Sequence, residues 1–154
     1  MHYFVFRNMT IENPMGQALS AIGGEASYSG YEDISAIAEA DKYIWWYLAP
    51  YKAETAVAAE EIGNYTSLLA LVLEQIPAEK TVIAFTIEPF FEVNCITGKD
   101  LLKSAIETYN AKLYELAGQY SNLRIFDFSS FTRNYSLTQL VDWKYYFISQ
   151  MAFN

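Results

Sequence analysis

The fold of this chain is decided by the stretch FVFRNMTIENP, which runs from Phe4 to Pro14. Its first three residues are all apolar, and a cluster of polar residues that begins with Arg7 and Asn8 follows at once. A strand on a half-exposed sheet alternates apolar and polar residues, whereas a strand buried on both faces does not. The stretch therefore indicates a buried parallel strand that delivers polar side chains at its carboxyl end, where α/β sheets bind ligands.

Four further segments resemble this strand. Each is short, rich in Val, Ile, Phe, Tyr or Trp, and bounded by polar residues, Gly or Pro. The central position of Trp45 and Trp46 in one of these segments predicts that both rings belong to the core. The five predicted strands are His2–Phe6, Glu25–Tyr28, Tyr43–Leu48, Thr81–Thr86 and Leu123–Phe128.

Helical patterns separate the predicted strands. Asn13 as N-cap and Pro14 at the first helical position predict a helix that Gly23 and Gly24 close. The region from Tyr51 to Gly63 is rich in Ala and Glu and is predicted to be helical without definite bounds. Three other helices are predicted: Tyr31–Ala40 with Ile34, Ile37 and Ala38 on one side, Asn64 as N-cap through Gln75, and a helix from Leu102 to Leu116 after the capping box Thr97–Asp100.

Alternating strands and helices predict an α/β fold with a parallel sheet and helices on both of its faces. Right-handed crossovers leave few topologies. The prediction is a flavodoxin-like, three-layer α/β/α sandwich with a five-stranded parallel sheet of order 2-1-3-4-5. The 154 residues suit one domain spanning residues 1–154, with a tail from Ser129 onward.

The charge and cysteine content of the sequence limit the binding partners and the compartment that we expect. The formal net charge is -8, with 18 acidic against 10 basic residues, so neither nucleic acid nor an anionic membrane is expected as a partner. A single cysteine excludes an internal disulfide and favours a reducing compartment. The amino terminus does not resemble a signal peptide, and apolar runs such as YIWWYLAP are too short to span a bilayer. We expect a soluble, cytoplasmic protein.

The sequence lacks the residues that several classes of reaction require. One histidine, His2, and one cysteine, Cys95, do not make a metal site, so no metal and no cofactor are expected. The segment after the first strand lacks the glycines of a phosphate-binding loop and the acids of a receiver domain. His2 begins the first strand and therefore lies at the amino end of the sheet. That position argues against a Ser-His-Asp triad.

Candidate ligand-binding residues follow the predicted strands, because the carboxyl ends of parallel strands share one edge of the sheet. Most of them could instead have a purely structural role. Arg7 would then pair with Glu12 or Asp33, Asn8 and Thr10 would cap a turn, and Gly30 would serve backbone geometry. Glu88 would be a solvated loop acid, and Asp127 would cap the next segment. Gly30 is followed at this edge by Tyr31, Glu32 and Asp33. The candidate set is Arg7, Asn8, Thr10, Gly30, Glu88, Asn94, Asp127, Asp142 and Tyr145.

The sequence resembles the SGNH-hydrolase-like N-terminal domain of FkbH-like proteins, a branch of the HAD superfamily (subfamily IIIC) linked to surface-carbohydrate and polyketide-starter biosynthesis. The resemblance is carried by FRNMTIEN, SGYEDI, FTIEPFF, NLRIFDF and VDWKYYFISQMAFN, which are spread over nearly the whole chain. It implies a flavodoxin-like fold of bacterial origin. It also implies a HAD-type catalytic domain as a partner, because that domain carries an Asp-x-Asp-x-Thr motif that this chain lacks.

The chain departs from the SGNH pattern at each catalytic turn. The Gly-Asp-Ser turn after the first strand is replaced by Arg7–Thr10, and the Gly-x-Asn turn after the third strand is replaced by Ala49–Tyr51. The final Asp-x-x-His retains Asp142 and has Tyr145 at the histidine position. A tyrosine with a pKa near 10 is a poor general base at neutral pH. We therefore expect a degenerate, non-catalytic domain.

Three functions follow from these features. In the first, the domain is a binding module in surface-glycan or acyl-carrier-linked biosynthesis, with Arg7 holding an anion and Asn8, Glu88 and Asp142 orienting hydroxyl groups. In the second, it is an atypical esterase or acyltransferase, with Thr10 or Ser129 as nucleophile and Glu88 or Asp142 as base. In the third, it is a structural domain whose aromatic segment Asp142–Asn154 docks on a HAD domain or on a second copy.

Overall fold

The computed structural model describes residues 1–50, 55–87, 99–128 and 130. Five strands in these residues form one parallel sheet of order β2-β1-β3-β4-β5. This arrangement confirms the predicted fold class and strand order. The strands are β1 (His2–Arg7), β2 (Glu25–Tyr31), β3 (Lys42–Trp46), β4 (Thr81–Phe85) and β5 (Leu123–Phe126).

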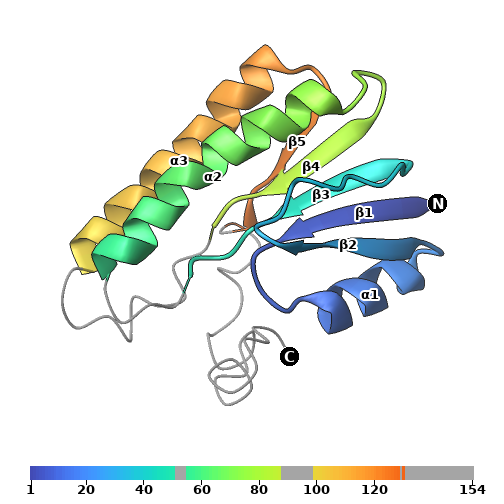
Figure 1. Ribbon diagram of the computed structural model, residues 1–154, viewed down its shortest axis with the longest axis horizontal. Coiled ribbons are helices and arrows are strands. Elements are labelled where there is room, and N and C mark those ends of the chain that lie inside the picture. The colour runs from blue at the N-terminus through green and yellow to red at the C-terminus, as the bar shows by residue number, and fades with distance from the viewer. Residues whose placement is uncertain (51–54, 88–98, 129, 131–154) are drawn as a thin grey trace.

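Three helices in the described residues form the two outer layers (Figure 1). Helix α1 (Glu12–Ala21) packs beside β2. Helices α2 (Thr55–Gln75) and α3 (Lys99–Gln119) lie side by side on the other side of the sheet. This is the layer pattern that right-handed crossovers produce when the chain moves outward from β1 in two directions.

The predicted helix over Tyr31–Ala40 is wrong. Tyr31 ends β2, and the residues up to β3 form an irregular connection. Glu32 has a φ of 54°, which no helical residue adopts. The Asp33 Oδ1 accepts hydrogen bonds from the backbone N–H and the hydroxyl of Ser35, at 2.8 and 2.6 Å. Such local side-chain bonds compete with helix formation, so the β2–β3 crossover has no helix.

Two predicted helix starts are also wrong. Helix α1 is preceded by Ile11 as its N-cap residue, so Asn13 already lies inside the first turn. Helix α2 begins at Thr55, which makes Asn64 an interior residue and confirms that most of the region before it is helical. The end of α1 agrees with the prediction, because Gly23 adopts a φ of 76° just beyond the helix.

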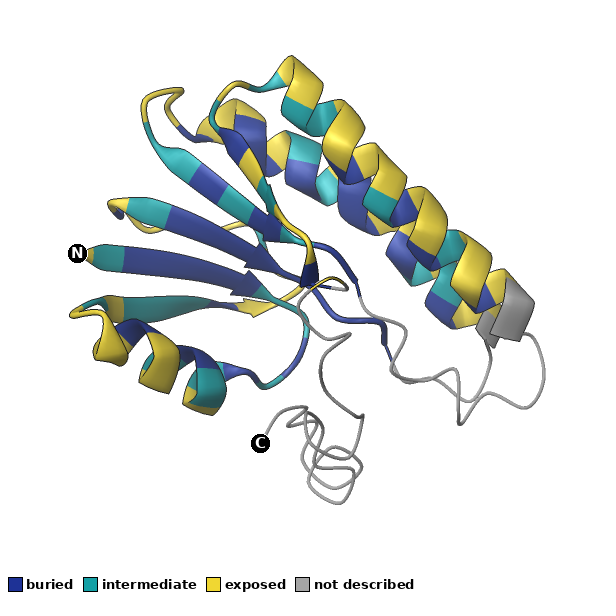
Figure 2. Cartoon of the chain, turned by 180° about the vertical axis from the view of Figure 1, so that it is seen from behind, coloured by how far each residue is buried: buried dark blue, intermediate teal, exposed yellow. Residues whose placement is uncertain are grey.

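Buried residues are concentrated in the central strands and recur along α2 and α3 (Figure 2), and aromatic residues make up much of this core. Trp45 is fully buried, stacks on Tyr47 at 4.0 Å and donates its indole N–H to the hydroxyl of Tyr109 at 2.8 Å. Tyr47 in turn meets Tyr65 of α2 edge to face at 4.8 Å. The prediction that Trp45 and Trp46 belong to the core is confirmed. These contacts fix α2 and α3 over the carboxyl half of the sheet.

One described helical stretch, Ala56–Gln75, is long and apolar enough to cross a membrane by length and composition alone. It has 20 residues and a mean hydropathy of 1.2, but it is not a continuous apolar run, because Glu60, Glu61 and Asn64 interrupt it. A buried core helix meets the same criteria. In this structure Tyr65, Leu69 and Val72 of the stretch pack into the core against the sheet and α3.

Candidate functional site

Arg7 ends β1 and is held by protein groups on several sides. Its Nε donates a hydrogen bond to the carbonyl of Ser29 at 2.8 Å, and its guanidinium forms an ion pair with Glu12. The guanidinium also lies over the rings of Tyr31 and Tyr28, at 4.8 and 5.3 Å from their centroids. Its side chain is only 15% exposed. The structural alternative of pairing with Glu12 is therefore confirmed, and the charge of Arg7 is largely balanced within the protein.

Asn8 joins the carboxyl end of β1 to the chain that follows β3. Its Nδ2 donates to the carbonyl of Leu48 at 2.7 Å and to the hydroxyl of Tyr65 at 2.9 Å, and its Oδ1 accepts from the N–H of Leu48 at 2.9 Å. In a 2-1-3-4-5 sheet the topological switch point lies between β1 and β3. The side-chain amide of Asn8 thus bridges β1 and the segment after β3 at the carboxyl end of the sheet, where proteins of this fold usually bind a ligand.

The hydrogen bonds continue outward from Asn8 to Glu32. The hydroxyl of Tyr65 accepts from Asn8 and donates to Oε1 of Glu32 at 3.1 Å. Burial raises the pKa of Tyr65 well above its usual value, and the Glu32 carboxylate raises it further. The phenol therefore stays protonated at neutral pH and serves as a fixed donor. The backbone N–H of Glu32 donates to the carbonyl of Arg7 at 2.9 Å, which ties the loop after β2 to β1.

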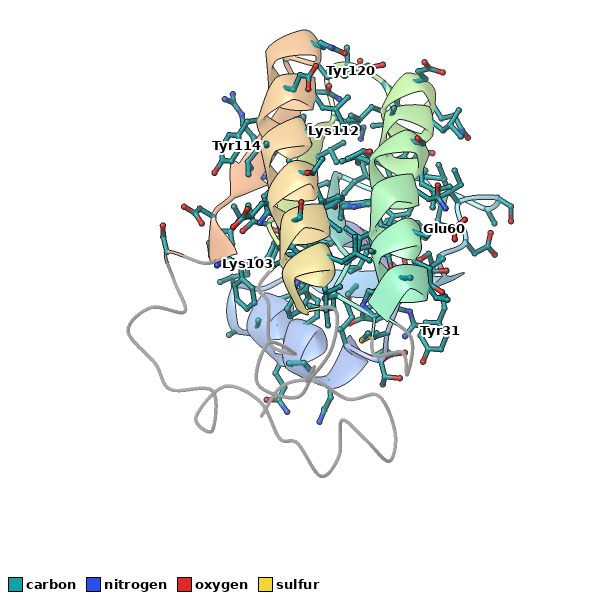
Figure 3. The ribbon with its side chains drawn as sticks, turned by 90° about the vertical axis from the view of Figure 1, so that its left-hand side faces the viewer. Tyr31, Glu60, Lys103, Lys112, Tyr114 and Tyr120 are labelled. Carbon is teal, nitrogen blue, oxygen red and sulfur yellow. The ribbon has the colours of Figure 1, made fainter. Side chains whose placement is uncertain are left out.

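A groove of about 430 Å³ opens beside this hydrogen-bonded chain. We call it the Glu32 groove. It lies between the loop after β2 and helix α2, and its two carboxylates, Glu32 and Glu61, lie among uncharged polar side chains. Figure 3 places Tyr31, the residue before Glu32, near the amino-terminal half of α2. The groove is lined by Glu32, Glu61, Asn64, Tyr65, Ser67 and Leu68.

Two lining positions break local conformational rules. Glu32 adopts a left-handed φ of 54°, a conformation that favours Gly or Asn and strains other residues by about 1–3 kcal/mol. Asn64 follows Gly63 in the middle of the 21-residue helix α2, where both residue types weaken a helix. Rule-breaking residues concentrate at functional sites in natural proteins. Both positions lie at the same groove, and this coincidence makes it the candidate site.

The remaining described candidates have local partners. Thr10 Oγ1 shares a 2.6 Å hydrogen bond with the hydroxyl of Tyr31. A Cβ on Gly30 would lie 3.2 Å from the Cβ of Asp33, so the turn packs closely there. Asp127 accepts from the N–H and the hydroxyl of Ser130 at 3.1 and 2.6 Å, which is the predicted capping role. Glu88, Asn94, Asp142 and Tyr145 lie outside the described residues.

The structure thus brings Arg7, Asn8, Thr10 and Gly30 together around Tyr31 and Glu32. It places Asp127 after β5, with β3 and β4 between it and β1. The residue that sequence reasoning missed is Tyr65, which lies 57 positions from Asn8 on an apolar helix and gave no signal of contact. Among the described residues, no group of three His, Cys, Asp or Glu side chains is arranged to hold a metal ion.

Comparisons with known proteins find a structure of similar fold and identify no family. Neither a scan against protein-family models nor a search of curated proteins produced a match. Among solved structures, the chain is similar to the crystal structure of the N-terminal part of the protein BF1531 from Bacteroides fragilis, which contains a phosphatase domain and was complexed with Mg. The TM-score is 0.72 at 11% sequence identity. The match covers 100% of this chain and 47% of that one, so this chain shares the fold of about half of a phosphatase-domain protein.

Proposed function

We propose that this protein is a non-catalytic, SGNH-hydrolase-like binding module that holds a hydroxyl-rich ligand in the Glu32 groove. The observation that carries the proposal is the strained Glu32 itself. Its carboxylate is positioned by Tyr65, its backbone N–H is held by Arg7, and it borders a groove of about 430 Å³. A strained backbone conformation persists only where the surrounding structure holds it in place, and such residues cluster at functional sites.

The chemistry of the groove favours a hydroxyl-rich ligand over an anion. The Glu32 carboxylate, whose Oε1 accepts a hydrogen bond from Tyr65, is an acceptor when ionised and would repel a phosphate or carboxylate. Asn64 and Ser67 both donate and accept hydrogen bonds, as sugar hydroxyls do. The cation that we had expected to hold an anion, Arg7, is already paired with Glu12. A neutral polyol or the sugar end of a larger molecule suits this set best.

In the described part of the chain, the hydroxyl at the expected nucleophile position is already hydrogen-bonded, and this supports a binding role. Thr10 follows β1 where the resemblance would put the catalytic serine, and its hydroxyl is bonded to the phenol of Tyr31. A phenol is a poor general base for removing that proton. Asn8 uses both of its N–H donors and its oxygen within the protein. The atypical esterase or acyltransferase therefore remains the weaker alternative.

The setting of this activity is proposed from the resemblance. We place the module in cytoplasmic surface-glycan or acyl-carrier-linked biosynthesis, where a HAD-type phosphatase domain is the partner. The structural likeness to a protein that contains a phosphatase domain supports this pairing. A docking role for the module is therefore the second candidate function. Titration of this chain with a purified FkbH-type phosphatase domain in a calorimeter tests it, and the absence of any binding heat argues against it.

The binding proposal is tested by thermal shift against nucleotide-sugars, phosphoglycerates, acyl-CoAs and simple esters. Glu32→Gln removes the charge of the central carboxylate, and Glu60→Gln is the matched control, because Glu60 lies on α2 but lines a different groove. A ligand at about 100 times its Kd adds roughly 2.7 kcal/mol to the free energy of unfolding, a rise of roughly 5–10 °C in Tm for a chain of this length.

We expect a concentration-dependent Tm rise with nucleotide-sugars, whose neutral sugar end enters the groove while the phosphates stay outside it. This rise should occur in the wild type and in Glu60→Gln and be lost in Glu32→Gln. A Tm rise that Glu32→Gln leaves unchanged would place the ligand elsewhere. Turnover of a simple ester would favour the hydrolase alternative. A rise only with phosphoglycerates, lost in Arg7→Ala, would restore the anion-binding role of Arg7.

A further inference from the structure

Tyr31 carries a large aromatic ring that is exposed and yet held in place. It ends β2 and is 56% exposed. Its hydroxyl shares a 2.6 Å hydrogen bond with Oγ1 of Thr10, and the guanidinium of Arg7 lies 4.8 Å from its ring centroid. Arg7 is itself paired with Glu12, so the support beneath the ring is fixed as well. A ring that is already ordered loses little conformational freedom when a ligand binds to it.

The free surface of this ring is one of its flat faces. The guanidinium of Arg7 covers the other face, so the exposed area of Tyr31 lies on the face opposite Arg7 and on the ring edges. Strand β2 is the outermost strand at its end of the sheet order, which leaves room beside the ring. Figure 3 shows Tyr31 at the rim of the molecule, near the amino-terminal turns of α2. Tyr31 therefore presents a flat aromatic platform to solvent.

This platform adjoins the Glu32 groove. Tyr31 directly precedes Glu32, whose carboxylate is held by Tyr65 and lines the groove. The backbone N–H of Glu32 donates to the carbonyl of Arg7, the same residue whose guanidinium supports the Tyr31 ring. The two side chains leave neighbouring Cα atoms, which are about 3.8 Å apart, so one ligand can contact both.

The opposite wall of the groove also has an exposed apolar side chain. Val57 is 40% exposed and lies four residues before Glu61, so the two residues share one side of α2. Asn64 and Leu68 continue this side and line the groove with Glu61. The site thus combines a few polar groups with apolar surface beside them, as small-molecule sites in proteins usually do.

A ring-shaped sugar suits this combination of surfaces. Its hydroxyl groups lie around the edge of the ring, where they can pair with the carboxylate of Glu32, the amide of Asn64 and the hydroxyl of Ser67. The flat side of the sugar ring carries C–H groups, which pack on the electron-rich face of an aromatic ring such as Tyr31. An open-chain polyol has the same hydroxyl groups but lacks the flat C–H surface that a platform would select.

We propose that Tyr31 is the stacking platform of the Glu32 groove and that the ligand is a cyclic sugar. Its C–H face packs on the Tyr31 ring while its hydroxyl groups enter the groove. This inference rests on the proposed binding function and deepens it, because it narrows the ligand from any polyol to a ring sugar and adds a residue that determines specificity.

Calorimetric titration of the full chain with UDP-glucose and UDP-N-acetylglucosamine tests the proposal, together with saturation-transfer NMR on the same samples. Tyr31→Ala removes the ring, whereas Tyr31→Phe keeps the ring and removes only the hydrogen bond to Thr10. Tyr114→Ala is the matched control, because Tyr114 is 53% exposed on α3 and does not line the groove. Circular dichroism verifies that each variant is folded.

We expect Tyr31→Ala to raise the Kd about tenfold and Tyr31→Phe to stay within about threefold of the wild type, because the energy comes from the ring face. Tyr114→Ala should leave the Kd unchanged. Saturation should transfer to the C–H protons of the sugar ring, and this transfer should disappear in Tyr31→Ala. A merely structural role of Tyr31 would not select these protons.

Four results would overturn the platform. An unchanged Kd in Tyr31→Ala, with binding still lost in Glu32→Gln, would remove Tyr31 from the site and leave the proposed function intact. Equal losses in Tyr31→Ala and Tyr31→Phe would assign the effect to the Thr10 hydrogen bond. Saturation transfer to the uracil protons alone would replace the sugar ring by the base. Absence of binding to the wild type would overturn the proposed function and the platform together.

Discussion

Replacement of Asn8 by Ala is the sharpest test of how the sheet edge is built. Asn8 makes three hydrogen bonds of 2.7–2.9 Å, two to the backbone of Leu48 and one to Tyr65. Each such bond contributes about 0.5–1.5 kcal/mol net. Leu48 is 3% exposed, so its N–H and C=O would lose their partners in a buried site, where each unsatisfied group costs about 1–3 kcal/mol. We expect Asn8→Ala to lower the free energy of unfolding by about 3–5 kcal/mol.

Urea unfolding followed by tryptophan fluorescence measures this loss, because Trp45 and Trp46 lie in the same sheet. Thr10→Val is the control, since Thr10 has one hydrogen bond, to the exposed Tyr31, and should cost less than about 1 kcal/mol. A loss below about 1 kcal/mol for Asn8→Ala would refute the structural role, and it would mean that water replaces Asn8 at an open edge.

Three further outcomes are expected. Glu32→Gly should relieve the left-handed strain and raise the free energy of unfolding by about 1 kcal/mol in urea melts, while abolishing ligand-induced stabilisation; a loss of stability would show that the Tyr65 bond outweighs the strain. Burial raises the pKa of Tyr65 and Tyr109, so these phenols keep their protons in the folded protein at a pH where the unfolded chain releases them. Their contribution to the free energy of unfolding is fully present below pH 10 and should fall above it by about 1.4 kcal/mol per pH unit per tyrosine. Urea melts at several pH values would measure this fall. The His2 backbone N–H lowers the pKa of Asp41 below its ordinary 3.8, so its contribution is present above that pH and lost as the pH falls through the lowered pKa; acid melts of Asp41→Asn should lack this part of the transition.

The sheet was predictable because its signal is local. Each strand is a short apolar run, and the alternation of strands with helices leaves few right-handed orders, so 2-1-3-4-5 followed from the sequence. The helix predicted over Tyr31–Ala40 was wrong because Ile34 and Ile37 have helical spacing, while Glu32 and Asp33 form a local turn that such spacing does not reveal.

The site was predictable only in part. The polar cluster after β1 was visible as a break in an apolar run, and the structure gathers Arg7, Asn8 and Thr10 there. Their partners were not visible, because hydrogen bonds from Asn8 to Leu48 and Tyr65 join positions 40 and 57 residues apart. The left-handed Glu32 could not be foreseen, since the neighbouring Gly30 and Asp33 favour that conformation more than a glutamate does.

The measurement that tests the central claim most directly is backbone-amide chemical-shift mapping of the full chain with a nucleotide-sugar that raises Tm. If the Glu32 groove is the binding site, the largest shifts will fall on Glu32 and on the α2 residues Glu61, Asn64 and Ser67. Largest shifts on Ser104, Thr108 and Lys112, which line the groove between α2 and α3, would contradict the account and move the site to that groove.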